Sequence, residues 1–205
     1  MLILYHAPGS FSSRILWLLE ELGADYQIEV VSYPEADGSN ADPRNPHPHG
    51  YTPALAHQGQ VVTETGAIAL YLTDLFPDAE VGVPVGHPLR ARYLTWLLYQ
   101  VGLTEPLVYM KGKKLLEQDA AMSHLNDAMM RHIHTTLAAG SYILGERFTA
   151  VDILYMSLFE QARPLLGHSV VLDAYLARAD RPARQRAISK DLSCGPCPVK
   201  PDTEL

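Results

Sequence analysis

Apolar residues at the start of the chain change from a strand spacing to a helical spacing. The run Leu2–Tyr5 is short and continuous, which is typical of one buried strand. From Ser13 onward apolar residues recur three and four positions apart until Gly23, a residue suited to the left-handed position just after a helix. Pro8 and Gly9 separate the two patterns and predict a tight turn. The opening segment is therefore expected to fold as strand, turn and helix.

Strand and helix patterns continue to residue 76. Residues 26–33 are rich in aromatic and β-branched residues, and residues 52–57 and 60–64 flank a Gln-Gly turn that predicts a hairpin. Residues 65–76 return to a helical spacing. A strand, a helix and a strand imply a right-handed crossover and a parallel pair, so we expect a mixed four-stranded sheet in the order βαβ-ββα. The polar loop 34–51 is long, and such loops are usually functional or mobile.

Strand patterns end after a stretch rich in proline and glycine that precedes residue 88. A long helical pattern covers residues 88–114, and Pro106 is expected to kink or break it. Further helices are expected over residues 117–139, 150–165, 171–178 and 181–190. We therefore predict an α/β domain over residues 1–78, a linker over 79–87, an all-α domain over 88–190 and a tail over 191–205.

Composition and charge narrow the class of protein. The 205 residues are 47% hydrophobic and 19% charged, an ordinary globular balance. The net charge of −7 argues against nucleic acid or an anionic membrane as a partner. No apolar run approaches the ~20 residues of a membrane span, and the first residues lack the pattern of a signal peptide. We expect a cytoplasmic protein.

Three hydroxyl side chains gather where the first helix is expected to begin: Ser10, Ser12 and Ser13. A helix N-terminus presents unpaired N–H groups and the positive end of the helix dipole, which attract anions and favour a thiolate over a thiol. Serines in front of a helix are most often N-caps. The segment alone leaves both interpretations open, and one serine can cap while another does chemistry.

The chain resembles the cytosolic glutathione S-transferases over about residues 1–190. Its opening is similar to that of the serine-type fungal and bacterial branch, LYHxPGSxSxRILWLLEELG. The motifs that carry the resemblance are Pro8-Gly9-Ser10, Thr52-Pro53, Glu64-Thr65 and Phe148–Ile153. The resemblance implies a thioredoxin-like α/β N-terminal domain and an all-α helical-bundle C-terminal domain. It also implies a homodimeric detoxification enzyme that conjugates glutathione, its co-substrate, to a small apolar electrophile.

In serine-type members of the family, the serine of the first turn donates a hydrogen bond to the sulfur of glutathione. Ser10 is expected in this role by its place after Pro-Gly, with Ser12 and Ser13 as alternatives. Lowering a thiol pKa by ~2 units requires about 2.7 kcal/mol. A charge-assisted hydrogen bond and the helix dipole can supply that amount. Phe11 occupies the position where another branch has cysteine, so the turn offers no mixed-disulfide mechanism.

The resemblance implies further contacts to glutathione. Pro53 is expected to follow a cis peptide bond, with the backbone of Thr52 holding the cysteinyl part of the tripeptide. Glu64 is expected to accept from the γ-glutamyl ammonium. The hydroxyl of Thr65, where the family has serine, and the helix N-terminus would hold the adjoining carboxylate.

One position departs from the family pattern and keeps other functions open. Tyr51 stands where related members often have lysine or glutamine, two residues before the cis-proline. His49, or His47 or Arg44 from the same loop, would then hold the glycine-end carboxylate of glutathione. The alternatives are a glutathione-dependent disulfide reductase or peroxidase, and a non-catalytic thioredoxin-like binding module.

In the helical half, the resemblance places Tyr99 and Leu103 in the pocket for the electrophile. Thr149 and Asp152 have the spacing of a capping box, flanked by a hydrophobic staple of Phe148 and Ile153, and we interpret them as structural.

Two further patterns are weaker. Cys194-Gly-Pro-Cys197 has the sequence of a thioredoxin redox centre, but no strand precedes it, so we expect a tail disulfide or unpaired thiols. The pairs His47/His49 and His132/His134 lack supporting ligands, and we expect no metal.

Overall fold

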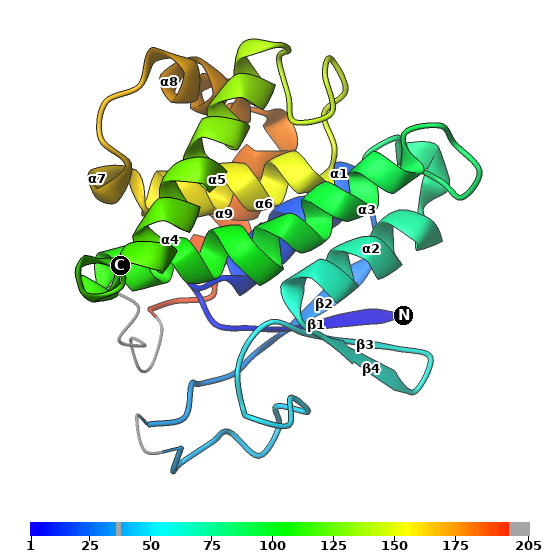
Figure 1. Cartoon of the computed structure of the whole chain (residues 1–205). Helices are drawn as coiled ribbons and strands as arrows, with labels where there is room; N and C mark the ends of the chain where they lie inside the picture. Colours follow the sequence, from blue (N-terminus) through cyan, green and yellow to red (C-terminus); the bar gives the residue numbers. More distant parts are fainter. Residues whose placement is uncertain (36–37, 197–205) are drawn as a thin grey trace. The chain divides into compact units, whose positions relative to one another are not determined.

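A computed structural model describes residues 1–35 and 38–196 of the chain (Figure 1). The described residues divide into two compact units. Unit 1 joins Met1–Ala79 to the segment that begins at Arg181, and unit 2 is Glu80–Asp180. Among the described residues, no helix has the length and apolar character needed to cross a bilayer.

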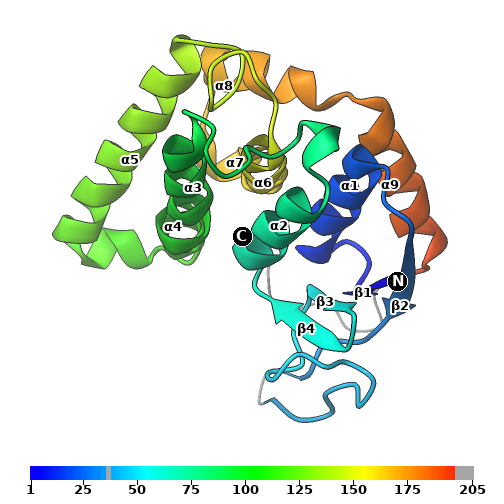
Figure 2. The ribbon, with the colours of Figure 1, turned by 90° about the vertical axis from the view of Figure 1, so that its right-hand side faces the viewer.

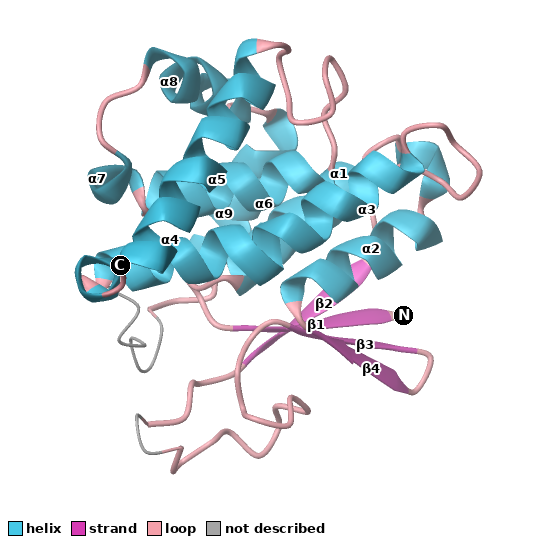
Figure 3. Cartoon of the chain, in the orientation of Figure 1, coloured by secondary structure: helices cyan, strands magenta, loops and turns pink. Residues whose placement is uncertain are grey.

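In the described part of the chain, unit 1 contains one four-stranded sheet in the order β2-β1-β3-β4, which Figure 3 shows in magenta. The central strand β1 is parallel to β2 and antiparallel to β3, and β3 and β4 form the hairpin. This confirms the predicted mixed sheet. The strand bounds are Leu2–His6 for β1, Tyr26–Val30 for β2, Ala54–His57 for β3 and Gln60–Thr63 for β4.

The helices of unit 1 lie on one side of this sheet (Figure 2). Their bounds are Ser12–Leu22 for α1, Thr65–Leu75 for α2, Pro77–Ala79 for the short η1 and Pro182–Ser193 for α9. The apolar positions of α1 form its buried face: Ile15, Leu16, Leu18 and Leu19 have no exposed surface. Gly23 ends α1 at φ +61°, which confirms the predicted left-handed cap.

The position of α9 differs from the prediction, which placed residues 181–190 in the helical domain and began a tail at 191. In the structure this helix packs against α1 and runs on to Ser193. Two adjacent acids of α1 explain the attachment. Glu20 is 2.7 Å from Arg186 and 2.5 Å from Lys190, and Glu21 is 2.5 Å from Arg181.

The Glu20 carboxylate is unusually acidic because of these contacts. Burial alone would raise its pKa, but hydrogen bonds from Lys190, Tyr26 and Arg186 outweigh burial and lower the pKa to about 2. Burial, together with the same carboxylate, raises the pKa of the Tyr26 hydroxyl. The charge pairing thus gives the C-terminal helix a fixed partner on α1.

Unit 2 is helical. The predicted helix over 88–114 is interrupted, as expected, close to Pro106, which is the second residue of α4. A π-helical segment, Gln100–Thr104 (η2), separates α3 from α4. The other bounds are Arg90–Tyr99 for α3, Glu105–Gly112 for α4, Leu115–Gln118 for η3, Ala120–Ala138 for α5, Ala150–Gln161 for α6, Arg163–Leu166 for α7, Val170–Leu176 for α8 and Ala177–Ala179 for η4.

Asp152 organises the start of α6 and has no exposed surface. Its carboxylate accepts the Thr149 N–H at 2.8 Å, the Ile143 N–H at 2.9 Å and the Tyr175 hydroxyl at 3.0 Å. Burial raises the pKa of Asp152 to about 6, and these hydrogen bonds limit the rise. The capping box is present, which confirms the structural interpretation of Thr149 and Asp152.

Candidate functional site

The site begins at the turn between β1 and α1. Its backbone is closed by two hydrogen bonds, from Ser10 N–H to the Ala7 carbonyl at 3.2 Å and from Ser13 N–H to the Ser10 carbonyl at 3.0 Å. Gly9 supplies the positive φ, +70°, that the turn requires. Ser10 is half-buried and lies two residues before Ser12, the first residue of α1. Its hydroxyl therefore lies at the positive end of the helix dipole.

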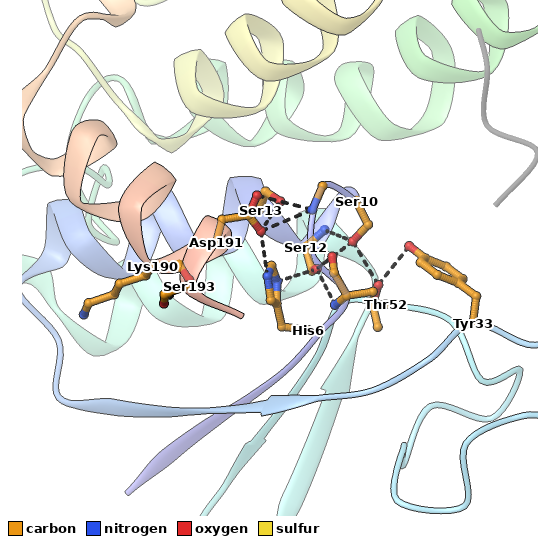
Figure 4. Close-up of polar contacts among 11 residues, drawn as sticks. His6, Ser10, Ser12, Ser13, Tyr33, Thr52, Lys190, Asp191 and Ser193 are labelled. Carbon is orange, nitrogen blue, oxygen red and sulfur yellow. Dashed lines mark hydrogen bonds and ion pairs between the residues drawn. The ribbon is translucent and has the colours of Figure 1, made fainter. Parts of the chain in front are cut away.

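The hydroxyl of Ser10 starts a chain of polar contacts that leads into the protein (Figure 4). Ser10 Oγ is 2.7 Å from Ser12 Oγ, and Ser12 Oγ is 2.7 Å from His6 Nδ1. The other imidazole nitrogen, His6 Nε2, is 2.7 Å from Asp191 Oδ1 of α9. Ser12 and His6 have no exposed surface, so the chain connects the turn to an interior imidazole.

Asp191 holds several groups of the turn together. Its carboxylate accepts the Gly9 N–H at 3.2 Å and the Ser13 hydroxyl at 3.1 Å, in addition to contacting His6. Burial would raise the pKa of Asp191, but the His6 contact and these hydrogen bonds lower it overall. Asp191 is therefore a carboxylate at neutral pH, and the Ser13 hydroxyl donates its hydrogen bond to it.

The second element of the site is the start of β3. The Thr52–Pro53 peptide bond is cis, as expected from the sequence. Thr52 is almost fully buried, and its Oγ1 lies 3.2 Å from Ser10 Oγ and donates to the Tyr33 hydroxyl at 2.9 Å. The two segments that the sequence predicted to bind the cysteinyl part of a ligand are thus in direct contact through their hydroxyl groups.

The third element is the connection from β4 to α2. Glu64 has φ +67°, an uncommon backbone conformation for a non-glycine residue, and its side chain is 79% exposed. Thr65 is half-buried and is the first residue of α2. Glu64 therefore presents its carboxylate to solvent beside a helix N-terminus, where anions are favoured.

Three cationic or imidazole candidates come from the long loop, and the structure distinguishes them. Arg44 is paired with Asp42 and Glu29, each at 2.7 Å. His47 is buried; its Nδ1 accepts the His49 N–H at 3.1 Å, and its Nε2 is 3.9 Å from Glu64. Burial lowers the pKa of His47 more than Glu64 raises it. The ring of His49 is exposed, so it is the candidate that can meet a ligand.

Three further residues that the sequence predicted for the site are all half-buried: Phe11, Tyr99 and Leu103. Phe11 is half-buried beneath the guanidinium of Arg14, 4.2 Å from its ring centre. In unit 2, Tyr99 is half-buried against the rings of Trp96 and His132, and burial raises the pKa of its hydroxyl. Leu103 is half-buried within the π-helical segment.

The cysteine motif is described only in part, because Cys197 lies outside the described residues. Cys194 is half-buried and caps the C-terminal end of α9. Burial and the nearby Asp191 charge raise the pKa of its thiol, so it lacks the activated thiolate of a redox centre. Within residues 1–35 and 38–196, no group of three or more His, Cys, Asp or Glu side chains is arranged to hold a metal ion.

Sequence reasoning missed three members of the site: His6, Tyr33 and Asp191. A histidine at the end of an otherwise apolar strand was the available signal for His6. Asp191 was assigned to the tail, and its contact with His6 spans 185 positions, which no local pattern indicates.

The fold and the site define a class of protein: a thioredoxin-like domain with a hydroxyl-lined strand-to-helix turn and a cis-proline, followed in the chain by a helical unit. Residues 9–75 match the family model of the glutathione S-transferase N-terminal domain. Glutathione S-transferase GstA of Escherichia coli O157:H7 is 27% identical over 199 residues, which cover 92% of this chain and 98% of that protein.

Solved structures are similar over the same range. A glutathione transferase from Methylococcus capsulatus has a TM-score of 0.76 and 27% identity, covering 94% of this chain and 100% of that chain. A sphingomonad glutathione S-transferase complexed with glutathione has a TM-score of 0.72 and 25% identity, covering 92% and 98%. These findings confirm the fold expected from the sequence, and they make the chain similar to glutathione S-transferases over most of its length.

Proposed function

We propose that the chain is a serine-type glutathione transferase of the fungal and bacterial branch, which transfers the glutathione thiolate to a small apolar electrophile. The observation that carries this proposal is the position of Ser10. Its half-buried hydroxyl lies at the N-terminus of α1, in contact with Thr52 at the cis-proline. Similarity to a transferase solved with glutathione supports the choice of ligand.

In this proposal Ser10 donates to the sulfur and the dipole of α1 favours the negative charge. A charge-assisted hydrogen bond contributes ~1.5–3 kcal/mol, and a helix terminus up to ~2 kcal/mol. Ser12 has no exposed surface and Ser13 is bonded to Asp191, so Ser10 is the serine best suited to meet a ligand.

The rest of the tripeptide is assigned to the other elements of unit 1. The backbone of Thr52, before Pro53, would hold the cysteinyl part. Glu64 would accept from the γ-glutamyl ammonium, while Thr65 and the N-terminus of α2 hold the adjoining carboxylate. Phe11, which the resemblance placed among the glutathione-binding residues, would contact glutathione through the apolar surface of its ring. His49 would hold the glycine-end carboxylate in place of the cation that Tyr51 lacks.

Unit 2 would bind the electrophile, with Tyr99 and Leu103 as the first candidates. We further propose a homodimer that works in the cytoplasm and uses no metal.

Conjugation of glutathione to a chlorodinitroarene tests the proposal, with binding measured by calorimetry on the same sample. The variant S10A should lose about 10- to 100-fold in kcat/KM, since it removes a charge-assisted hydrogen bond that forms with the thiolate. Its affinity for glutathione should change little. The control S193A removes a hydroxyl that bonds only a backbone carbonyl of α9 and should behave as the parent protein.

Two results would contradict the proposal. Disulfide reduction without conjugation would favour the reductase alternative, and no glutathione binding at millimolar concentration would favour the binding module.

A further inference from the structure

The hydrogen bonds that connect Ser10 to His6 through Ser12 can be assigned one direction from the charge of Asp191. His6 Nε2 lies 2.7 Å from the Asp191 carboxylate, a close charge contact that lacks ordinary hydrogen-bond geometry. Because a carboxylate can only accept, we assign the proton of the neutral ring to this nitrogen. His6 Nδ1 is then an acceptor. The Ser12 hydroxyl has two acceptors within reach, His6 Nδ1 at 2.7 Å and the Ala7 carbonyl at 3.2 Å, and we assign its proton to the nearer one, His6. Ser12 Oγ is left to accept from Ser10 at 2.7 Å and from the Ala7 N–H at 3.2 Å.

In this resting arrangement the Ser10 hydroxyl donates its hydrogen bond to Ser12 Oγ. Its oxygen accepts the Ser12 N–H at 3.1 Å and contacts Thr52 Oγ1, whose own proton points to Tyr33. Ser10 can therefore receive a proton from a ligand but cannot donate one until the direction of the chain reverses. A hydroxyl that only stabilised a preformed thiolate would not require a hydrogen-bonded path to an imidazole.

We propose that His6, oriented by Asp191, accepts the proton of the glutathione thiol through Ser10 and Ser12, an inference that rests on the proposed function. The thiol proton moves to Ser10 Oγ as Ser10 passes its own proton to Ser12 and Ser12 passes its proton to His6 Nδ1. No heavy-atom bond forms or breaks. The products are a thiolate and an imidazolium, so the proton stays in the protein.

The same transfer converts Ser10 into a donor. Once His6 is protonated, it donates to Ser12, Ser12 donates to Ser10, and Ser10 donates to the thiolate sulfur. The stabilising hydrogen bond of the proposed function is therefore the result of deprotonation by this route. Asp191 acts as a positioning residue, because it contacts His6 and the turn and is assigned no contact with glutathione.

The surroundings of His6 suit the charge that the transfer creates. A thiol, with an ordinary pKa of about 8.5, holds its proton more firmly than an imidazole, at about 6.5, so both products need stabilisation. The N-terminus of α1 favours the thiolate, and the Asp191 carboxylate lies 2.7 Å from His6 Nε2, opposite the nitrogen that receives the proton. On the strand side His6 pairs with Val30 of β2, and β3 pairs with β1 only up to Tyr5. The Cys194 thiol lies near the Asp191 carboxylate, and it stays neutral because burial and this charge raise its pKa.

Counting protons tests the relay. Glutathione binding to the full chain is measured by calorimetry at one pH in buffers of different ionisation enthalpy, and thiolate formation is followed by its ultraviolet absorbance. If the relay operates, the thiolate forms while almost no proton is released to the buffer. If the helix dipole and Ser10 act alone, each thiolate formed releases close to one proton.

Two variants locate the acceptor. D191N keeps the shape of the side chain but removes the negative charge, and S12A removes the connecting hydroxyl while leaving His6 and Asp191 together. Both should raise proton release per thiolate toward one, lower kcat/KM about 10- to 100-fold and move the pH profile upward. S193A, on the same helix, is the matched control and should equal the parent protein.

The outcomes separate the relay from the function on which it rests. Full proton release by the parent protein would overturn the relay, even with normal conjugation, and needs no folded variant. Equal proton release in D191N, S12A and the parent would also overturn it. Absence of thiolate and of conjugation in the parent would instead overturn the proposed function, and the relay with it.

Discussion

Replacing Glu20 by glutamine should destabilise the chain by loosening α9 from α1. The Glu20 carboxylate contacts Arg186 at 2.7 Å, Lys190 at 2.5 Å and the Tyr26 hydroxyl at 2.6 Å, and its side chain is only 8% exposed. Glutamine keeps the shape and one acceptor oxygen but removes the charge. The loss is therefore mainly that of two charge-assisted hydrogen bonds.

The expected magnitude follows from the pKa of Glu20. A value of about 2, compared with the usual 4.5, corresponds to about 3 kcal/mol at ~1.36 kcal/mol per pKa unit. Arg186 and Lys190 are 54% and 48% exposed, so solvent screening reduces this to about 1–2 kcal/mol. For a chain of this length such a change lowers Tm by about 2–8 °C.

The pH dependence of the free energy of unfolding distinguishes an electrostatic loss in E20Q from a loss of packing. Because the pKa of Glu20 is lower in the folded chain, its stabilisation is complete above pH 4.5 and is lost as the pH falls toward 2. Urea unfolding of the parent and of E20Q should differ at pH 7 and converge near pH 2–3. The control E29Q alters an exposed pair with Arg44 and should cost less than about 0.5 kcal/mol. A deficit in E20Q that does not change with pH would refute the electrostatic explanation.

Three further changes probe other parts of unit 1. Replacing Glu64 by glutamine should raise KM for glutathione about 10-fold with little effect on thermal unfolding, because its exposed carboxylate is assigned to the ligand; an unchanged KM would remove it from the site. Replacing His49 by alanine should raise the same KM about 3- to 10-fold, while glutathione amidated at its glycine-end carboxylate should give the same KM with H49A as with the parent. Replacing Gly23 by alanine should cost about 1 kcal/mol in urea unfolding because φ there is +61°, and a neutral result would mean that the helix end rearranges.

How far the sequence predicts this molecule depends on the range of each interaction. The sheet, the first helix and its Gly23 cap follow from spacings within about ten residues, and these predictions were confirmed. The capping box of Thr149 and Asp152 is also local and was predicted correctly. The cis bond before Pro53 came from a motif in a recognisable context, since a Thr-Pro pair alone favours the trans form.

The parts that could not be predicted depend on distant residues. No local pattern indicates that Arg186 and Lys190 of α9 pair with Glu20, which lies more than 160 positions earlier in the chain. The loop offered Arg44, His47 and His49 as equivalent candidates. Only the fold shows that Arg44 is paired within unit 1 and that His47 is buried, because both facts depend on how the loop returns to the sheet.

The two roles of α9 are physically linked. Lys190, which contacts Glu20, is adjacent in sequence to Asp191, which contacts His6, and a rise of ~1.5 Å per residue leaves little freedom between them. The ion pairs of α9 with Glu20 thus help to fix the distance between the Asp191 carboxylate and His6. A helix that sequence analysis assigned partly to the helical domain and partly to a tail therefore contacts the first turn, and the variant E20Q, which loosens α9, should also weaken the contact of Asp191 with His6.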